Sequence, residues 1–248
     1  MTYQIFHGTP DAIAGEDIFQ IQEAQNFGQP PACPPFTLAY DGNCPHTIFE
    51  HVIRRNDLCD RILGAIKLAE NAAAKLEAKP LHPNTVAIFV KIFGQAPHNR
   101  WEVAWATRRT SPAGEIVARR FRTVAKELRT RDTAYRCVSA SQCSQGGGGA
   151  GSQEPSHPTE TIVRDRVAWA VLCKDEVRLC PQFWQLRKEE RTSTVLHEMF
   201  HLCFGLTCAW FQHDGKERKR NSAYCYEAFA LSVANISINT ADCDNTPI

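Results

Sequence analysis

The chain has 248 residues, of which 43% are hydrophobic and 22% are charged, as in an ordinary globular protein. This length suits one large domain or two small ones, with a substantial core. The formal net charge is only +1, so no overall field favours a nucleic acid or an anionic membrane as a partner. No run of about 18 apolar residues occurs, so the sequence predicts no membrane-spanning helix.

Eleven cysteines are spread along the chain without a Cys-x-x-Cys pair. This usage favours disulfides in an oxidising compartment over a zinc ribbon or a thioredoxin-like site. Because the count is odd, at least one thiol is free or pairs with another chain. Asn235-Ile236-Ser237 is an N-glycosylation sequon, which agrees weakly with secretion. The first residues show no basic segment followed by an apolar one, so we expect no signal peptide in this sequence and a secreted, extracellular protein.

Residues 1–55 are predicted to form an N-terminal extension of unknown role. Two Pro-Pro pairs interrupt its first 44 residues, which show no sustained periodicity, and Cys33 and Cys44 are candidates to tie it down. A helical pattern with an alanine-rich continuation covers residues 56–78. We therefore assign residues 56–248 to the main domain.

Two more helices are predicted before residue 131. Asn84 can cap a helix over residues 85–93, which Gly94 ends. Side chains in residues 101–105 alternate in character as they do in a strand, but a short helix is equally compatible with this stretch. Residues 112–115 begin the next helix, and its arginines indicate a solvated face rather than a nucleic-acid groove. The apolar face of that helix carries Val117, Phe121, Val124 and Leu128.

The second half of the domain begins with β structure. Residues 135–139 are predicted to form a short strand, and the Gly/Ser/Pro-rich residues 144–158 a flexible loop. Residues 167–173 and 176–180 alternate well enough for a hairpin. The last long helix is expected over residues 221–235, with one apolar face.

The helix predicted over residues 192–205 contains the candidate metal-binding and catalytic residues. His197 and His201 are four residues apart, so their rings lie on one helix face, where both can bind one tetrahedral zinc ion. Glu198 follows the first histidine and can take a proton from zinc-bound water. Thr192 or Ser193 can cap the helix and Gly205 can end it. Because apolar residues surround its axis, we expect this helix to be buried almost all round.

Three stretches extend the motif, with the sequences VRLCPQFW (177–184), TVLHEMFH (194–201) and NSAYCYEAFA (221–230). Together with the helical portion that ends in Tyr135-Arg136-Cys137, they resemble the deuterolysin and peptidyl-Lys metalloendopeptidase family, the aspzincins. The resemblance covers about residues 56–235. It implies a secreted α+β zinc endopeptidase with a zincin-like core, mostly helical with a small β-sheet or hairpin.

The chain departs from that family at the third zinc ligand, which is an aspartate in a Gly-Thr-x-x-Asp-type turn. Residues 205–210 read GLTCAW and offer no carboxylate. We predict Asp214 as the third ligand, with His213 as its closest competitor and a Cys203–Cys208 bridge locking the loop.

The family's acidic substrate pocket is also altered, because Tyr224 replaces an aspartate while Glu227 is kept. Glu227 is therefore predicted to line the substrate pocket, with a reduced preference for lysine. A second scheme makes Glu227 the third zinc ligand, 26 residues after His201. Tyr224 is the predicted donor to the oxyanion; Tyr226 is the alternative, unless it belongs to the core.

The predicted activity is zinc-dependent hydrolysis of peptide bonds. A catalytic Zn²⁺ lowers the pKa of its water to about 7. Glu198 takes that water's proton and delivers it to the leaving amine. The expected substrate is a protein or peptide, the expected partners include no nucleic acid or membrane, and a monomer is expected. The alternative is a weakly active or inactive zinc-binding protein, a scavenger or an interaction module, on the same fold.

Overall fold

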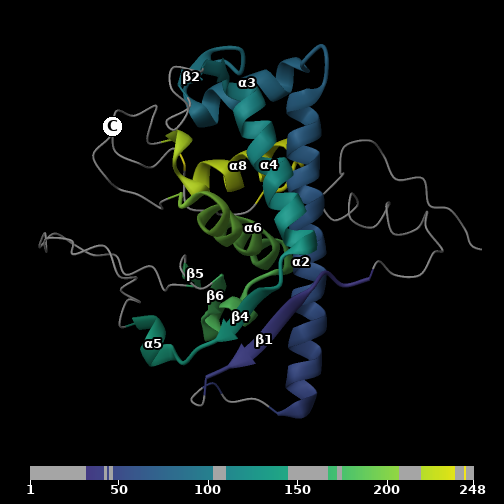
Figure 1. Cartoon of the computed structure of the whole chain (residues 1–248), viewed down its shortest axis with the longest axis vertical. Helices are drawn as coiled ribbons and strands as arrows, with labels where there is room; N and C mark the ends of the chain where they lie inside the picture. The colour runs from purple at the N-terminus through teal and green to yellow at the C-terminus, as the bar shows by residue number, and fades with distance from the viewer. Residues whose placement is uncertain are drawn as a thin grey trace, which may run out of the picture.

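The computed structural model describes residues 32–41, 44, 47–102, 110–144, 167–171, 175–206, 219–237 and 243. Over these residues the protein is an α+β domain, mostly helical with a small sheet, as predicted (Figure 1). No helix in these ranges has the length and apolar character needed to cross a membrane. The predicted loop over residues 144–158 lies almost wholly outside the described residues.

The main sheet has four strands in the order β1-β4-β6-β5. The pairings of β1 with β4 and of β4 with β6 are parallel, and the edge strand β5 runs antiparallel to β6. The β5–β6 pairing confirms the predicted hairpin. A separate antiparallel pair, β2 (Arg100–Glu102) and β3 (Thr110–Pro112), includes part of the predicted strand at 101–105. The strands of the main sheet are β1 (Phe36–Tyr40), β4 (Thr133–Cys137), β5 (Ala168–Val171) and β6 (Glu176–Leu179).

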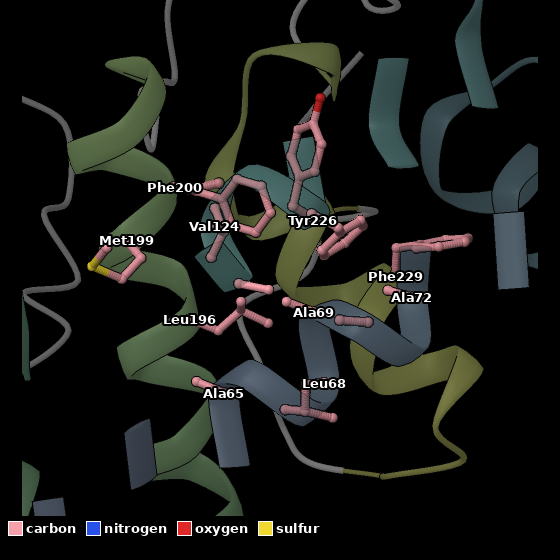
Figure 2. Packing of buried hydrophobic residues seen from close by; sticks show 14 of the residues in the cluster. Ala65, Leu68, Ala69, Ala72, Val124, Leu196, Met199, Phe200, Tyr226 and Phe229 are labelled. Atoms are coloured by element: carbon pink, nitrogen blue, oxygen red, sulfur yellow. The ribbon is translucent and has the colours of Figure 1, made fainter. Parts of the chain in front are cut away.

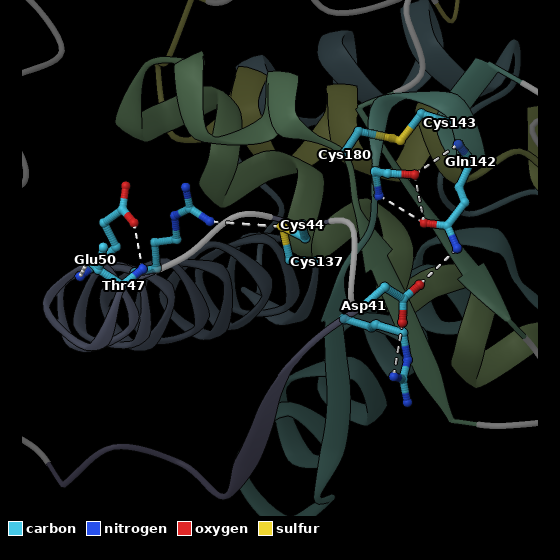
Figure 3. The surroundings of a disulfide bond; sticks show 11 residues. Asp41, Cys44, Thr47, Glu50, Cys137, Gln142, Cys143 and Cys180 are labelled. Carbon is cyan, nitrogen blue, oxygen red and sulfur yellow. Dashed lines mark hydrogen bonds and ion pairs between the residues drawn. A yellow bond between two sulfur atoms is a disulfide. The ribbon is translucent and has the colours of Figure 1, made fainter.

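Strand β1 lies in the part of the chain where no regular element is predicted. It buries Phe36 and Leu38 on one side and pairs with the central strand β4 over its full length. The five residues of β1, which directly follow Pro34-Pro35, give too few alternations to stand out. Both cysteines expected to attach this segment to the domain do so: Cys33 bonds to Cys59. Figure 3 shows the second bond, between Cys44 and Cys137.

Helix α2 (Ile48–Glu77) begins eight residues before the predicted start, so the expected boundary at residues 55–56 falls inside it. Thr47 caps the helix: its hydroxyl accepts from the Glu50 N–H, and the Glu50 carboxylate accepts from the Thr47 N–H (Figure 3). This capping box is a local start signal. The first turns expose large apolar side chains, so the sequence there lacks the regular apolar and polar faces by which a helix is usually predicted. These side chains are Ile48, Phe49, Val52 and Ile53.

Three helices follow the predictions closely. Helix α3 (Pro83–Phe93) ends at Gly94, which has a φ of 71°, but its N-cap is His82, whose Nδ1 accepts from the Asn84 N–H. Helix α4 (Ala113–Thr130) buries the predicted apolar face. Helix α8 (Ala223–Val233) likewise buries its predicted core face. Two short elements complete the description, α5 (Ala140–Ser144) and a 3-10 turn over Pro181–Gln185.

Helix α6 (Lys188–Phe204) packs one face against α2, α4 and α8 (Figures 1 and 2). It begins four residues before the predicted caps Thr192 and Ser193. Both hydroxyls instead donate to carbonyls one turn back, at Lys188 and Glu190, as such residues do inside helices. The predicted end at Gly205 is confirmed by its left-handed φ of 58°. Core side chains of α6 include Leu196, Met199 and Phe200.

Four disulfides are present among the described residues, which fits the predicted oxidising compartment. Cys203, however, is a free thiol, so the predicted Cys203–Cys208 bridge is wrong. Cys203 lies half-buried on the last turn of α6, and burial raises the pKa of its thiol to about 12. Cys173 and Cys208 lie outside the described residues. The bonded pairs are Cys33–Cys59, Cys44–Cys137, Cys143–Cys180 and Cys225–Cys243.

The crossing of α2 and α6 depends on a glycine. A Cβ at Gly64 would lie 2.9 Å from Cγ2 of the buried Thr192. Thr192 cannot turn away freely, because its hydroxyl donates to the Lys188 carbonyl. Gly64 therefore permits the close approach of the two helices that fixes the position of α6.

Gly64→Ala is expected to lower the free energy of unfolding by about 1–3 kcal/mol, because it overpacks this crossing. Urea denaturation measures the change. The double variant Gly64→Ala/Thr192→Ser removes the clashing methyl group and keeps the hydroxyl, so it should recover most of the loss. Equal destabilisation of the single and double variants would show that the crossing is not limited by this contact.

Candidate metal centre

Two imidazoles converge on the inner side of α6. The ring centroids of His197 and His201 are 4.8 Å apart, and their Nε2 atoms are 3.0 Å apart. His197 is 5% exposed, and His201 is partly buried one turn further along the helix. The predicted four-residue spacing therefore brings one nitrogen of each ring to the same point.

The other nitrogen of each ring is held by an acceptor. The Nδ1 of His197 lies 3.0 Å from Oε2 of Glu227, which α8 presents from the neighbouring helix. The Nδ1 of His201 is hydrogen-bonded to the carbonyl oxygen of Leu206, just after Gly205 ends the helix. Carboxylate and carbonyl oxygens only accept, so both Nδ1 atoms donate. Each Nε2 is then left with its lone pair, the form in which histidine binds metals.

Two lone pairs facing each other at 3.0 Å repel unless a proton or a metal cation lies between the nitrogens. Tetrahedral zinc with bonds of about 2.0–2.1 Å places two of its nitrogen ligands about 3.3 Å apart. The observed separation is close to that value, and both rings carry the outer hydrogen bonds typical of zinc-bound histidines. The pair of imidazoles therefore fits two positions of a zinc site.

Within the described ranges, no three His, Cys, Asp or Glu side chains form a group able to hold an ion. The two candidates predicted from the sequence, Asp214 and His213, fall outside those ranges. Glu227 faces the Nδ1 of His197, the ring nitrogen turned away from His201. Its geometry favours orienting His197 over binding the ion itself.

Glu198 is 5% exposed, and its Oε2 atom makes no hydrogen bond. A buried carboxylate oxygen without a partner costs free energy, on the order of 1–3 kcal/mol or more. Such a cost is usual where the group is kept available for chemistry. Glu198 follows the ligand position His197 directly, so the unpaired oxygen belongs to the residue predicted to act as general base.

Tyr135 is a neighbour of Glu198 that no sequence pattern singles out. Its ring is buried on the central strand β4, and its hydroxyl also lacks a hydrogen-bond partner. Burial first, and then the negative charge of Glu198, raises the pKa of the Tyr135 hydroxyl. The motif alone could not reveal this residue, because a tyrosine in a buried strand looks like ordinary core.

The two candidate tyrosines have different environments. The ring of Tyr224 lies against His197, with centroids 4.4 Å apart, and is only partly buried. Tyr226 is fully buried in the core (Figure 2), where it accepts from Arg120 and donates to the Arg220 carbonyl. Tyr226 is therefore a core residue, and Tyr224 is the one that adjoins the imidazoles.

Glu227→Gln is expected to weaken zinc binding by about 10–100-fold, because the amide supports the His197 imidazole less strongly than the carboxylate does. Competition with a chromophoric chelator measures the affinity. Glu176→Gln is the matched control, since Glu176 is similarly buried but bonds Arg136 and Arg178 on the sheet. Unchanged affinity would contradict the supporting role, and loss as complete as in a histidine variant would make Glu227 a ligand.

The structure thus brings His197, His201, Tyr224 and Glu227 together at the contact of α6 and α8, while the Glu198 carboxylate lies near Tyr135 of β4. Glu227 is buried behind His197, whereas the sequence predicts it in a substrate pocket. The predicted ligand Asp214 stays a prediction. No protein-family model matches this chain, and no curated protein matches it.

Proposed function

We propose that the protein is a zinc-dependent endopeptidase with a zincin-like catalytic domain. The observation that supports this most is the convergence of two Nε2 atoms whose Nδ1 partners are both hydrogen-bond acceptors. The second support is the unpaired, buried oxygen of Glu198, the residue that follows His197 in the helix. The resemblance of the surrounding sequence to the aspzincins agrees with both.

His197 and His201 would hold the zinc ion, with Asp214 as the third protein ligand. Three protein ligands leave one position for water or substrate. Zinc bound there would supply Lewis-acid activation of a water molecule and of the peptide carbonyl. Glu198 accepts the proton released by the water and transfers it to the leaving amine. Its burial helps, because charges interact more strongly away from bulk water.

Two neighbouring side chains complete the proposed centre. Glu227 accepts from the Nδ1 of His197 and so fixes the direction of its metal-binding nitrogen. Tyr224, against the same ring, is the proposed donor to the carbonyl oxygen as negative charge develops on it. The four disulfides support a secreted protein that acts on extracellular proteins or peptides.

The test combines metal analysis with an unbiased cleavage assay. The purified full chain is expected to contain about one zinc ion per molecule and to cut a denatured protein at internal peptide bonds. A chelator should abolish cleavage and added zinc should restore it. Stoichiometric zinc with no cleavage of any peptide in a diverse library would favour the inactive zinc-binding protein. Absence of zinc would contradict both readings.

A further inference from the structure

The sequon Asn235-Ile236-Ser237 follows the last turn of α8, far along the chain from the metal-binding motif. It is the only Asn-x-Ser/Thr triplet in the sequence. Asn235 and Ser237 are both exposed, while Ile236 between them packs against the core. The amide and the hydroxyl that a glycosyl transferase must reach are therefore both at the surface.

The backbone around the sequon is set by the end of the helix. The Ile236 N–H donates to the Leu231 carbonyl at 2.9 Å, and Asn235 has a left-handed φ of 57°. A residue in the left-handed conformation commonly follows the last turn of a helix, and asparagine adopts that conformation more readily than most other residues. The helix end thus accounts for Asn235, but it makes no demand on the Ser237 side chain. A change at Ser237 can remove the sequon without disturbing the turn.

A shallow cavity of about 130 Å³ adjoins Asn235. Its lining mixes polar and apolar groups, as a sugar ring with an N-acetyl group requires. Thr85 in its wall is 4% exposed, and its hydroxyl makes no hydrogen bond with the described residues. Lys75 makes no ion pair with them either. Together with Asn235, the residues that line the cavity are Lys75, His82, Asn84, Thr85, Ile88 and Val233.

We propose that Asn235 carries an N-linked glycan whose first N-acetylglucosamine rests in this cavity. In the transfer, Asn235 Nδ2 attacks C1 of an oligosaccharide linked to a lipid diphosphate. The Nδ2–C1 bond forms, the bond from C1 to the diphosphate oxygen breaks, and the amide loses one proton as the lipid diphosphate leaves. The unpaired Thr85 hydroxyl and Lys75 ammonium face the sugar's polar groups, and Ile88 and Val233 face its methyl and C–H groups.

This site is separate from the metal centre. Asn235 lies eight residues after Glu227, which corresponds to about 12 Å along a helix. The inference does not depend on peptidase activity, only on passage through the oxidising secretory compartment that the four disulfides indicate.

The experiment directs the full chain into the secretory pathway of eukaryotic cells and treats the secreted protein with a peptide N-glycosidase. The wild type should lose the mass of one glycan, and peptide mapping should find Asn235 converted to aspartate. Ser237→Ala should be secreted without that mass. Ser237→Thr, which keeps the sequon, should retain it. A secreted wild-type protein with no glycosidase-sensitive mass would overturn the proposal.

Hydrogen exchange tests the cavity. Removing the glycan from the folded wild type should speed amide exchange in residues 82–88, since the first sugar no longer covers them. The untreated Ser237→Ala protein should exchange like the deglycosylated wild type. Exchange in this segment that is the same with and without the glycan would show that the sugar points into solvent, and would overturn its placement.

Discussion

Glu198→Gln is expected to lower kcat/KM for a peptide substrate by about 10²–10⁴-fold while zinc stays bound. The amide preserves the shape of the side chain but cannot take the proton from water. The Oε2 of Glu198 has no hydrogen bond to lose, so the fold should tolerate the change. Steady-state kinetics measures the activity, and metal analysis of the same preparation measures the zinc.

The matched control for this result is Glu189→Gln, in the first turn of the same helix. It removes one negative charge from α6 without touching the imidazoles, so kcat/KM should stay near that of the wild type. Full activity in Glu198→Gln would eliminate Glu198 as the base. Loss of zinc in that variant would instead place its carboxylate among the groups that hold the ion.

His201→Ala and His197→Ala are each expected to reduce zinc affinity by at least about 10³-fold and to abolish hydrolysis. Each change removes one of the two Nε2 atoms that meet at 3.0 Å. Equilibrium dialysis against buffered zinc measures the affinity. His98→Ala, at an exposed position after α3, controls for the loss of a histidine. Normal zinc content in either variant would mean that the ion, if present, binds elsewhere.

The same measurement identifies the third ligand. Asp214→Asn should lose zinc to a similar extent as His201→Ala, and His213→Ala should not. If His213→Ala loses zinc and Asp214→Asn retains it, the neighbouring histidine is the ligand. Zinc lost only with Glu227→Gln would require the carboxylate to leave the Nδ1 of His197 and bind the ion.

The elements with strong local signals could be predicted from the sequence. The amphipathic face of α4, the glycine that ends α6 and the β5–β6 hairpin are each determined by residues close together in the chain. The start of α2 could not, because its exposed apolar residues obscure the helical period. Strand β1 could not be predicted either, because its pairing with β4 joins residues about 97 apart in sequence.

The residues of the candidate site also fall into two groups: those that local spacing predicts and those that only the folded structure brings together. The four-residue spacing predicts that His197 and His201 share a helix face, since helix geometry alone settles it. The contact between His197 and Glu227 spans 30 residues and depends on how α8 packs against α6. The burial of Tyr135 beside Glu198 likewise depends on the whole sheet. Spacing therefore predicts that the two imidazoles meet, and only tertiary packing reveals the groups that orient them.

The disulfides have a consequence for how the protein would respond to metal removal. They close loops of 18 to 93 residues, and each cross-link of this kind contributes roughly 2–4 kcal/mol by restricting the unfolded ensemble. Small zinc domains, by contrast, unfold when the ion leaves. Here both imidazoles come from one helix that is already braced by the rest of the core. The apoprotein should keep its circular dichroism spectrum and be reloaded by simple titration, so that ion occupancy governs turnover without governing whether the chain is folded.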